Sequence, residues 1–145
     1  MALVTWTATF TLHTISDSPE EIAASLNGLI GGSLQRGLRP LLDGRGWKFG
    51  EAFPEDHGWD AEAEVLDAGK SVGLILVTSP ELDGKTSDGH ALSDRWRIVV
   101  GMDVGLFAKT KTRRLAILRA LAADADACCR QLGAADLEWE VGGPK

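Results

Sequence analysis

Residues 59–78 read WDAEAEVLDAGKSVGLILVT, and this stretch decides the fold. In its first half, apolar or small side chains alternate with acidic ones, which is typical of a β-strand with one face in water. Residues 67–70 form a tight connection, so the two halves should pair as a hairpin. The second half is apolar on both faces over residues 72–77, which predicts a strand in the interior of a sheet.

The same alternation predicts further strands on either side of this hairpin. They cover residues 3–13, 47–49, 95–101 and 137–141. All five tryptophans fall on predicted strands, in phase with the apolar faces wherever the alternation is clear. Because burying an indole ring removes a large apolar area from water, we expect the tryptophans to belong to the core. They are Trp6, Trp47, Trp59, Trp96 and Trp139.

Two amphipathic helices accompany the strands. The first begins at Ser18, where Pro19 and Glu21 complete a capping box, and its apolar residues step by three and four as far as Leu34. Pro40 should end this segment. Three glycines weaken the helix, and we expect them to allow close packing against a neighbour rather than to break it. They are Gly28, Gly31 and Gly32.

The second helix keeps a three-four apolar rhythm from Leu115 to Leu132, and Gly133 stands where a left-handed cap is expected. Thr110 or Thr112 should cap its start. The element order is therefore β-α-β-β-β-β-α-β, which predicts an α+β, two-layer sandwich with a largely antiparallel sheet of about six strands. Six strands span about 24 Å and two helices cover about 20 Å, so the helices should occupy one face only. We expect one domain over residues 1–141 and a flexible tail at 142–145.

Composition limits the classes of function. The chain has 145 residues, 44% of them hydrophobic, and a formal net charge of −6. This charge argues against nucleic-acid binding, because phosphate contacts require clustered cations. The longest apolar run, residues 72–77, is far shorter than the ~18 residues of a membrane span, and no leader pattern precedes it. We expect a cytoplasmic protein with no membrane partner.

Cysteine usage agrees with a reducing compartment. Cys128 and Cys129 are neighbours inside the second helix, where a bridge between them would need distorted geometry. We expect them to be reduced packing residues. No further cysteine or histidine stands nearby at ligand spacing, so we expect neither a metal nor another cofactor.

The uncovered sheet face is the first candidate site. Ile75, Val77 and Val99 should form an apolar patch there, ringed by charged side chains, as in a dimer interface or a docking surface. Two alternatives remain open: the charges could simply form cross-strand pairs, and a loop could fold over the patch. The charged candidates are Arg95, Arg97, Glu62 and Glu64.

A second candidate is the loop over residues 53–58, where Glu55 and Asp56 adjoin His57. A carboxylate beside an imidazole can tune its basicity for proton transfer. With the long segment 79–93, which we expect to be mobile, this loop could enclose a ligand pocket. An ordinary surface loop is the simpler interpretation, because no nucleophile motif accompanies the histidine. We assign no catalytic residue.

Four cations at the start of the second helix form a third candidate: Lys109, Lys111, Arg113 and Arg114. They oppose the helix dipole, and an anion site would explain them. The alternative is a solvated basic turn on an acidic molecule.

Together these patterns favour a non-enzymatic binding or regulatory protein of bacterial type. It would act through the open sheet face and the long loop, as a homodimer or as an immunity-like acidic neutraliser of a basic partner such as a toxin. The alternative is a small-ligand-binding protein or an enzyme that uses a loop pocket near His57.

Overall fold

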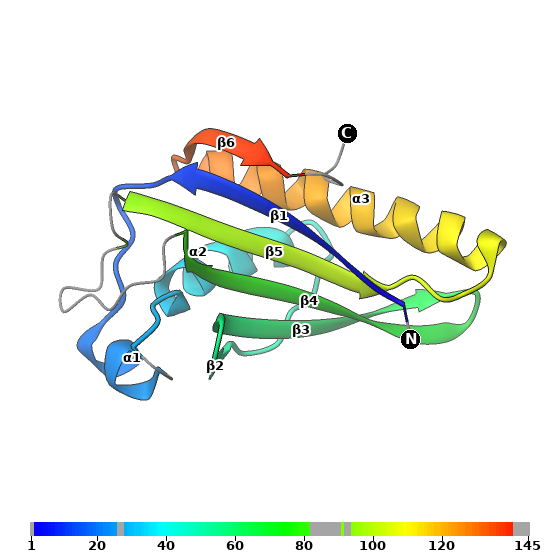
Figure 1. The fold of residues 1–145 in the computed structure, drawn as a ribbon, viewed down its shortest axis with the longest axis horizontal. Helices are drawn as coiled ribbons and strands as arrows, with labels where there is room; N and C mark the ends of the chain where they lie inside the picture. Colours follow the sequence, from blue (N-terminus) through cyan, green and yellow to red (C-terminus); the bar gives the residue numbers. More distant parts are fainter. Residues whose placement is uncertain (1, 26–27, 82–90, 92–93, 141–145) are drawn as a thin grey trace.

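The computed structural model describes residues 2–25, 28–81, 91 and 94–140. Within them the chain forms an α+β fold in which an antiparallel sheet carries two main helices, α2 and α3 (Figure 1). The elements are β1 (Leu3–Thr11), α1 (Pro19–Ala24), α2 (Gly32–Asp43), β2 (Phe53–Glu55), β3 (Gly58–Asp67), β4 (Lys70–Pro80), β5 (Arg95–Asp103), α3 (Ala108–Gln131) and β6 (Ala135–Trp139).

The six strands lie in the order β2-β3-β4-β5-β1-β6, and every neighbouring pair is antiparallel. The predicted hairpin is confirmed: Asp67 pairs with Lys70, and Ala68 and Gly69 both adopt positive φ at its turn. β4 has neighbours on both sides, as its apolar sequence predicts. Figure 1 shows α2 and α3 on the same side of the sheet, so the sandwich has two layers.

The core fills the space between the sheet and these helices. β1, β3, β4 and β5 contribute alternate side chains, and α3 contributes the predicted three-four stripe, with Leu118, Ala122 and Ala125 fully buried. Cys128 and Cys129 lie in the same core as free thiols. The largest fully buried side chains include Phe10, Leu12, Ile30, Leu34, Leu38, Leu42, Leu74, Leu76, Trp96, Ile98 and Met102.

The first helix differs from the prediction, because the chain forms two helices in its place. The capping box is present, since Ser18 Oγ accepts from the Glu21 amide and Glu21 Oε1 accepts from the Ser18 amide. However, α1 ends at Ala24, and Gly31, with a φ of 148°, is the N-cap residue that precedes α2. The glycines therefore break the helix, although Gly31 also makes the close approach that was expected, against Thr78.

Pro40 was also misplaced, because it lies inside α2 rather than ending it. A proline removes one backbone hydrogen bond of a helix. Leu38 and Leu42 are both fully buried on either side of it, so packing continues the helix to Asp43 despite that loss.

Residues 47–49 are not a strand, and the short strand lies at 53–55 instead. Trp47 is half-buried and its Nε1 donates to Asp124 on α3 at 2.8 Å, which ties this segment to the helix layer. Trp6, Trp59 and Trp96 are buried on strands as predicted. Trp139 is half-buried on β6, and its Nε1 donates to Asp126 on α3 at 3.0 Å.

The ends of α3 give a mixed result. Gly133 follows the helix with a φ of 108°, which confirms the left-handed cap. The predicted start was wrong: the helix begins at Ala108, and Phe107 precedes it without any side-chain cap.

No helix of the described residues is long and apolar enough to cross a membrane. The predicted tail at 142–145 and most of the predicted loop at 79–93 lie outside the described residues, while Ser79 and Pro80 belong to β4.

Candidate functional site

The uncovered face of the sheet brings several predicted interface residues together. In the strand register Glu62 lies opposite Ile75, and Val77 lies opposite Val99, so these side chains form two adjacent rows across β3, β4 and β5. Ile75 and Val99 are half-buried, whereas Val77 is only 7% exposed. Val77 points to the same side of β4 as Ile75 but is covered, so Ile75 and Val99 are the apolar side chains of this patch that a partner could touch.

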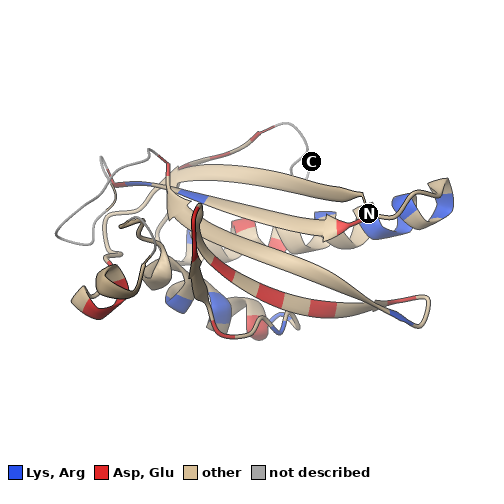
Figure 2. Ribbon diagram, turned by 60° about the horizontal axis from the view of Figure 1, so that its bottom comes forward, with Lys and Arg blue, Asp and Glu red and all other residues tan. Residues whose placement is uncertain are grey.

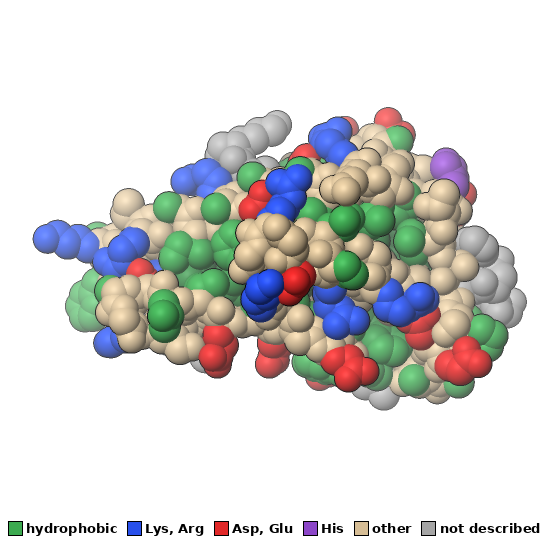
Figure 3. All heavy atoms as spheres, turned by 180° about the vertical axis from the view of Figure 1, so that it is seen from behind, with side chains coloured by type: hydrophobic (Ala, Val, Ile, Leu, Met, Phe, Trp, Pro, Cys, Tyr) green, Lys and Arg blue, Asp and Glu red, His purple; other side chains and the backbone are tan. Residues whose placement is uncertain are grey.

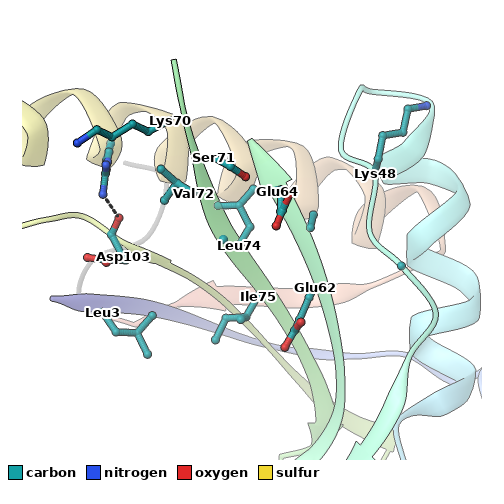
Figure 4. Close-up of a pocket in the computed structure, with 14 residues that line it drawn as sticks. Leu3, Lys48, Glu62, Glu64, Lys70, Ser71, Val72, Leu74, Ile75 and Asp103 are labelled. Carbon is teal, nitrogen blue, oxygen red and sulfur yellow. Dashed lines mark hydrogen bonds between the residues drawn. The ribbon is translucent and has the colours of Figure 1, made fainter. Parts of the chain in front are cut away.

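A hollow of about 950 Å³ lies over β3 and β4 on this part of the molecule (Figure 4). Its lining includes Glu62, Glu64 and Ile75, and it reaches Leu3 and Lys70. Gly73 lies between these groups, and a Cβ added to Gly73 would meet no atom within 4 Å. Because Gly73 has no side chain, the surface of β4 is hollowed at this position, beside Glu64 of β3.

The carboxylates beside the hollow are available to a ligand. Glu62 and Glu64 are exposed, and among the described residues neither takes part in an ion pair. Figure 2 shows acidic residues repeated along β3. The expected cross-strand pairs with Arg95 and Arg97 are not formed, because β4 separates β3 from β5.

The two arginines of the predicted interface are engaged elsewhere on the sheet. Arg95 Nε donates to Glu81 at 2.6 Å and its Nη1 donates to Thr11 Oγ1 at 3.0 Å. Arg97 Nε donates to Ser79 Oγ at 3.2 Å. The predicted interface therefore divides into an acidic part beside the hollow and a cationic part whose arginines are hydrogen-bonded to neighbouring side chains.

The predicted ligand loop is a hairpin rather than a loop. Glu55 pairs with Gly58, and Asp56 and His57 form its turn. His57 Nε2 forms a hydrogen bond with the Asp60 carboxyl group at 2.8 Å. Burial raises the pKa of Asp60, and the hydrogen bond from His57 partly offsets that rise. The hollow over β3 and β4 is not lined by Glu55, Asp56 or His57, and neither is a smaller hollow beside α1 and α2. A role for them stays a prediction.

The four cations at the start of α3 divide into two pairs. Lys109 and Lys111 are exposed. Arg113 and Arg114 instead contact Asp67, which is buried at the end of β3: Arg114 Nε donates to it at 2.8 Å and Arg113 Nη2 at 2.9 Å. Arg114 Nη1 also donates to the Asp103 carbonyl. These arginines join the β3–β4 turn to α3, whereas the two lysines form no ion pair with a described residue and could meet an anion.

The contact of Asp67 with both arginines predicts a specific acid response. Hydrogen bonds from Arg113 and Arg114 lower the pKa of Asp67 from 3.8 to about 2. A carboxyl whose pKa is lowered by folding stabilises the protein above its unfolded pKa, and this contribution disappears as the pH falls through the folded value. We expect Asp67→Asn to be less stable than the parent at pH 7, with the difference shrinking between about pH 4 and pH 2. Urea unfolding across this range measures it. A difference that does not depend on pH would contradict the assignment.

Comparison with family models, curated proteins and solved structures finds no match for this chain. Among the described residues no group of three or more histidine, cysteine or acidic side chains is placed to hold a metal ion. Burial raises the pKa of the Cys129 thiol far above its usual range, which leaves that thiol protonated and unreactive.

Sequence reasoning identified Ile75, Glu62 and Glu64 from their phase on the strands, but it missed the residues that shape the site. Gly73 gives no signal in the sequence, since a glycine in a strand can equally mark a bulge. Leu3 reaches the hollow because β1 and β5 pair in a particular register, with Leu3 opposite Asp103. That register could not be deduced from alternation.

Proposed function

We propose that the protein is a non-enzymatic binding protein that holds a basic segment of a partner protein over the outward side of β3 and β4, in the cytoplasm. The observation that carries the proposal is the hollow at Gly73, with Ile75 and two carboxylates in its lining that form no ion pair with a described residue. A lysine or arginine side chain entering from the partner would meet Glu62 or Glu64, and its apolar stem would lie against Ile75.

Charge supports a basic partner in two ways. The molecule carries a net charge of −6, which attracts a cationic protein from a distance and raises the rate of encounter. At close range the exposed carboxylates of Glu62 and Glu64 attract the basic groups of the partner to the outward side of β3. The reduced state of Cys128 and Cys129 fits the proposed cytoplasmic setting.

Filling the hollow tests the proposal without disturbing the core. We expect Gly73→Leu to reduce affinity for the partner at least tenfold, because the new side chain occupies the space that the partner needs. Its thermal stability should equal or exceed that of the parent, since glycine is unfavourable in strands and the position is open. The protein immobilised on beads captures partners from a cell extract, and surface plasmon resonance then compares the variants.

A charge-matched pair of variants separates a local contact from a general effect of net charge. Glu62→Gln with Glu64→Gln should weaken binding roughly tenfold and reduce its salt dependence. Glu138→Gln with Glu140→Gln removes the same charge near the opposite edge of the sheet and should leave binding nearly unchanged. Equal losses from the two pairs, or unaltered binding by Gly73→Leu, would exclude this face.

The oligomeric state of the isolated chain distinguishes binding of a different protein from self-association. Light scattering on the isolated chain should give the mass of a monomer. A dimer that Gly73→Leu converts to a monomer would assign the same face to a second copy of this chain and overturn the proposal of a basic partner.

A further inference from the structure

One end of the molecule gathers most of its exposed large hydrophobic side chains. Five such side chains are found among the described residues, and four of them lie at this end: Leu3 is 54% exposed, Leu66 76%, Leu106 79% and Phe107 80%. Their proximity follows from hydrogen bonds, because Asp67 at the β3–β4 turn contacts α3, and the Val104 amide donates to the Ala2 carbonyl. Figure 1 shows the chain start, this turn and the beginning of α3 at the same end.

The same end carries three exposed lysines. Lys70, Lys109 and Lys111 are exposed, and no ion pair joins them to another described residue. Lys109 and Lys111 stand in the first turns of α3, which contain no acidic residue and no side-chain cap. Cations at this position oppose the helix dipole, so they are unfavourable unless an anion approaches. In Figure 3 basic and hydrophobic side chains occur together at this end.

We propose that this end, formed by Leu66, Lys70, Leu106, Phe107, Lys109 and Lys111 and called the basic end, docks on an anionic lipid surface. Lysines attract the acidic headgroups, and exposed leucine and phenylalanine enter the boundary between headgroups and acyl chains. The departure from our expectation of no membrane partner has a clear source, since that expectation concerned only segments long enough to span a bilayer.

Shape favours lipid over an acidic protein as the occupant. The start of α3 and the β3–β4 turn project past the neighbouring end of β1 (Figure 1). A projecting corner presents little area to a flat protein surface, whereas specific protein interfaces bury about 800 Å² on each partner. A lipid surface deforms around such a corner. Docking by this corner alone would also position most of the acidic molecule farther from the anionic headgroups.

Vesicle co-sedimentation of the full chain tests the proposal. We expect binding to vesicles of phosphatidylcholine with one third phosphatidylglycerol, little binding to pure phosphatidylcholine, and release by salt. Lys109→Ala with Lys111→Ala should weaken binding roughly fivefold for each lysine removed. Leu106→Ser with Phe107→Ser should abolish retention at moderate salt. Lys48→Ala is the control, because Lys48 follows α2 and forms an ion pair with Asp43 at the end of that helix, and it should bind as the parent does.

The variants alter exposed side chains, so circular dichroism should show parent-like folding and melting. Failure of the parent to sediment with anionic vesicles would overturn the proposal, as would equal binding by the parent and both double variants. Binding to poly-glutamate without binding to vesicles would also overturn it, and would assign the basic end to an acidic protein.

Discussion

Replacing Gly31 by alanine should destabilise the protein by about 2–5 kcal/mol, from backbone strain and overpacking combined. Gly31 has a φ of 148°, a region that residues with a Cβ rarely adopt. A Cβ here would lie 2.4 Å from the carbonyl oxygen of Thr78, which belongs to the interior strand β4 and cannot withdraw easily. The same displacement would disturb the bond that Thr78 Oγ1 donates to the Gly31 carbonyl at 2.7 Å.

Two other glycines provide the controls for this substitution. Gly69 also has a positive φ, of 81°, but nothing lies within 4 Å of its added Cβ, so Gly69→Ala should cost only about 1 kcal/mol. Gly73→Ala has neither a positive φ nor a clash, and should be neutral or stabilising. Urea unfolding measures all three. Equal losses for Gly31→Ala and Gly69→Ala would mean that the contact with Thr78 is unimportant.

Most of the strands and their inward faces could be predicted, because alternation over residues 3–13, 59–78 and 95–101 reports directly which side chains face the core; the strand order could not. Helix ends depended on whether the capping group was local. The capping box of Ser18 and Glu21 spans three residues and was visible in the sequence. The start of α2 could not be predicted, because the side chain that caps it is Asp17, which lies 14 to 16 positions before the amides it binds.

The candidate site shows the same division between local and distant signals. Phase along β3 and β4 placed Glu62, Glu64 and Ile75 outward, and the structure agrees. Which strands are neighbours is a long-range property, so the expected pairing of Glu62 and Glu64 with Arg95 and Arg97 was wrong. The contact of Asp67 with Arg113 crosses 46 positions of sequence. Only the fold reveals that Arg113 and Arg114 are paired with Asp67, whereas Lys109 and Lys111 form no ion pair with a described residue.

Removing the Asp17 carboxylate should have a second large effect, which we expect to be a loss of about 2–4 kcal/mol in the free energy of unfolding. Asp17 is only 4% exposed, and its oxygens accept hydrogen bonds from the backbone amides of Gly31, Gly32 and Ser33 at 3.0–3.2 Å. The Ser33 hydroxyl donates to the same carboxylate at 2.6 Å. Asp17→Ala would leave these buried donors without their acceptor at the positive end of the α2 dipole.

Graded variants can separate the hydrogen bonds from the charge. Asp17→Asn keeps one acceptor oxygen in place and should lose less stability than Asp17→Ala. Asp43→Ala removes the same charge from an exposed side chain at the far end of α2, and should change stability by no more than about 0.5 kcal/mol. Urea unfolding at neutral pH compares the three. If Asp17→Ala and Asp43→Ala lowered the free energy of unfolding equally, the apolar face of α2 alone would hold that helix in place. Asp17 would then not be a stabilising cap at the start of α2.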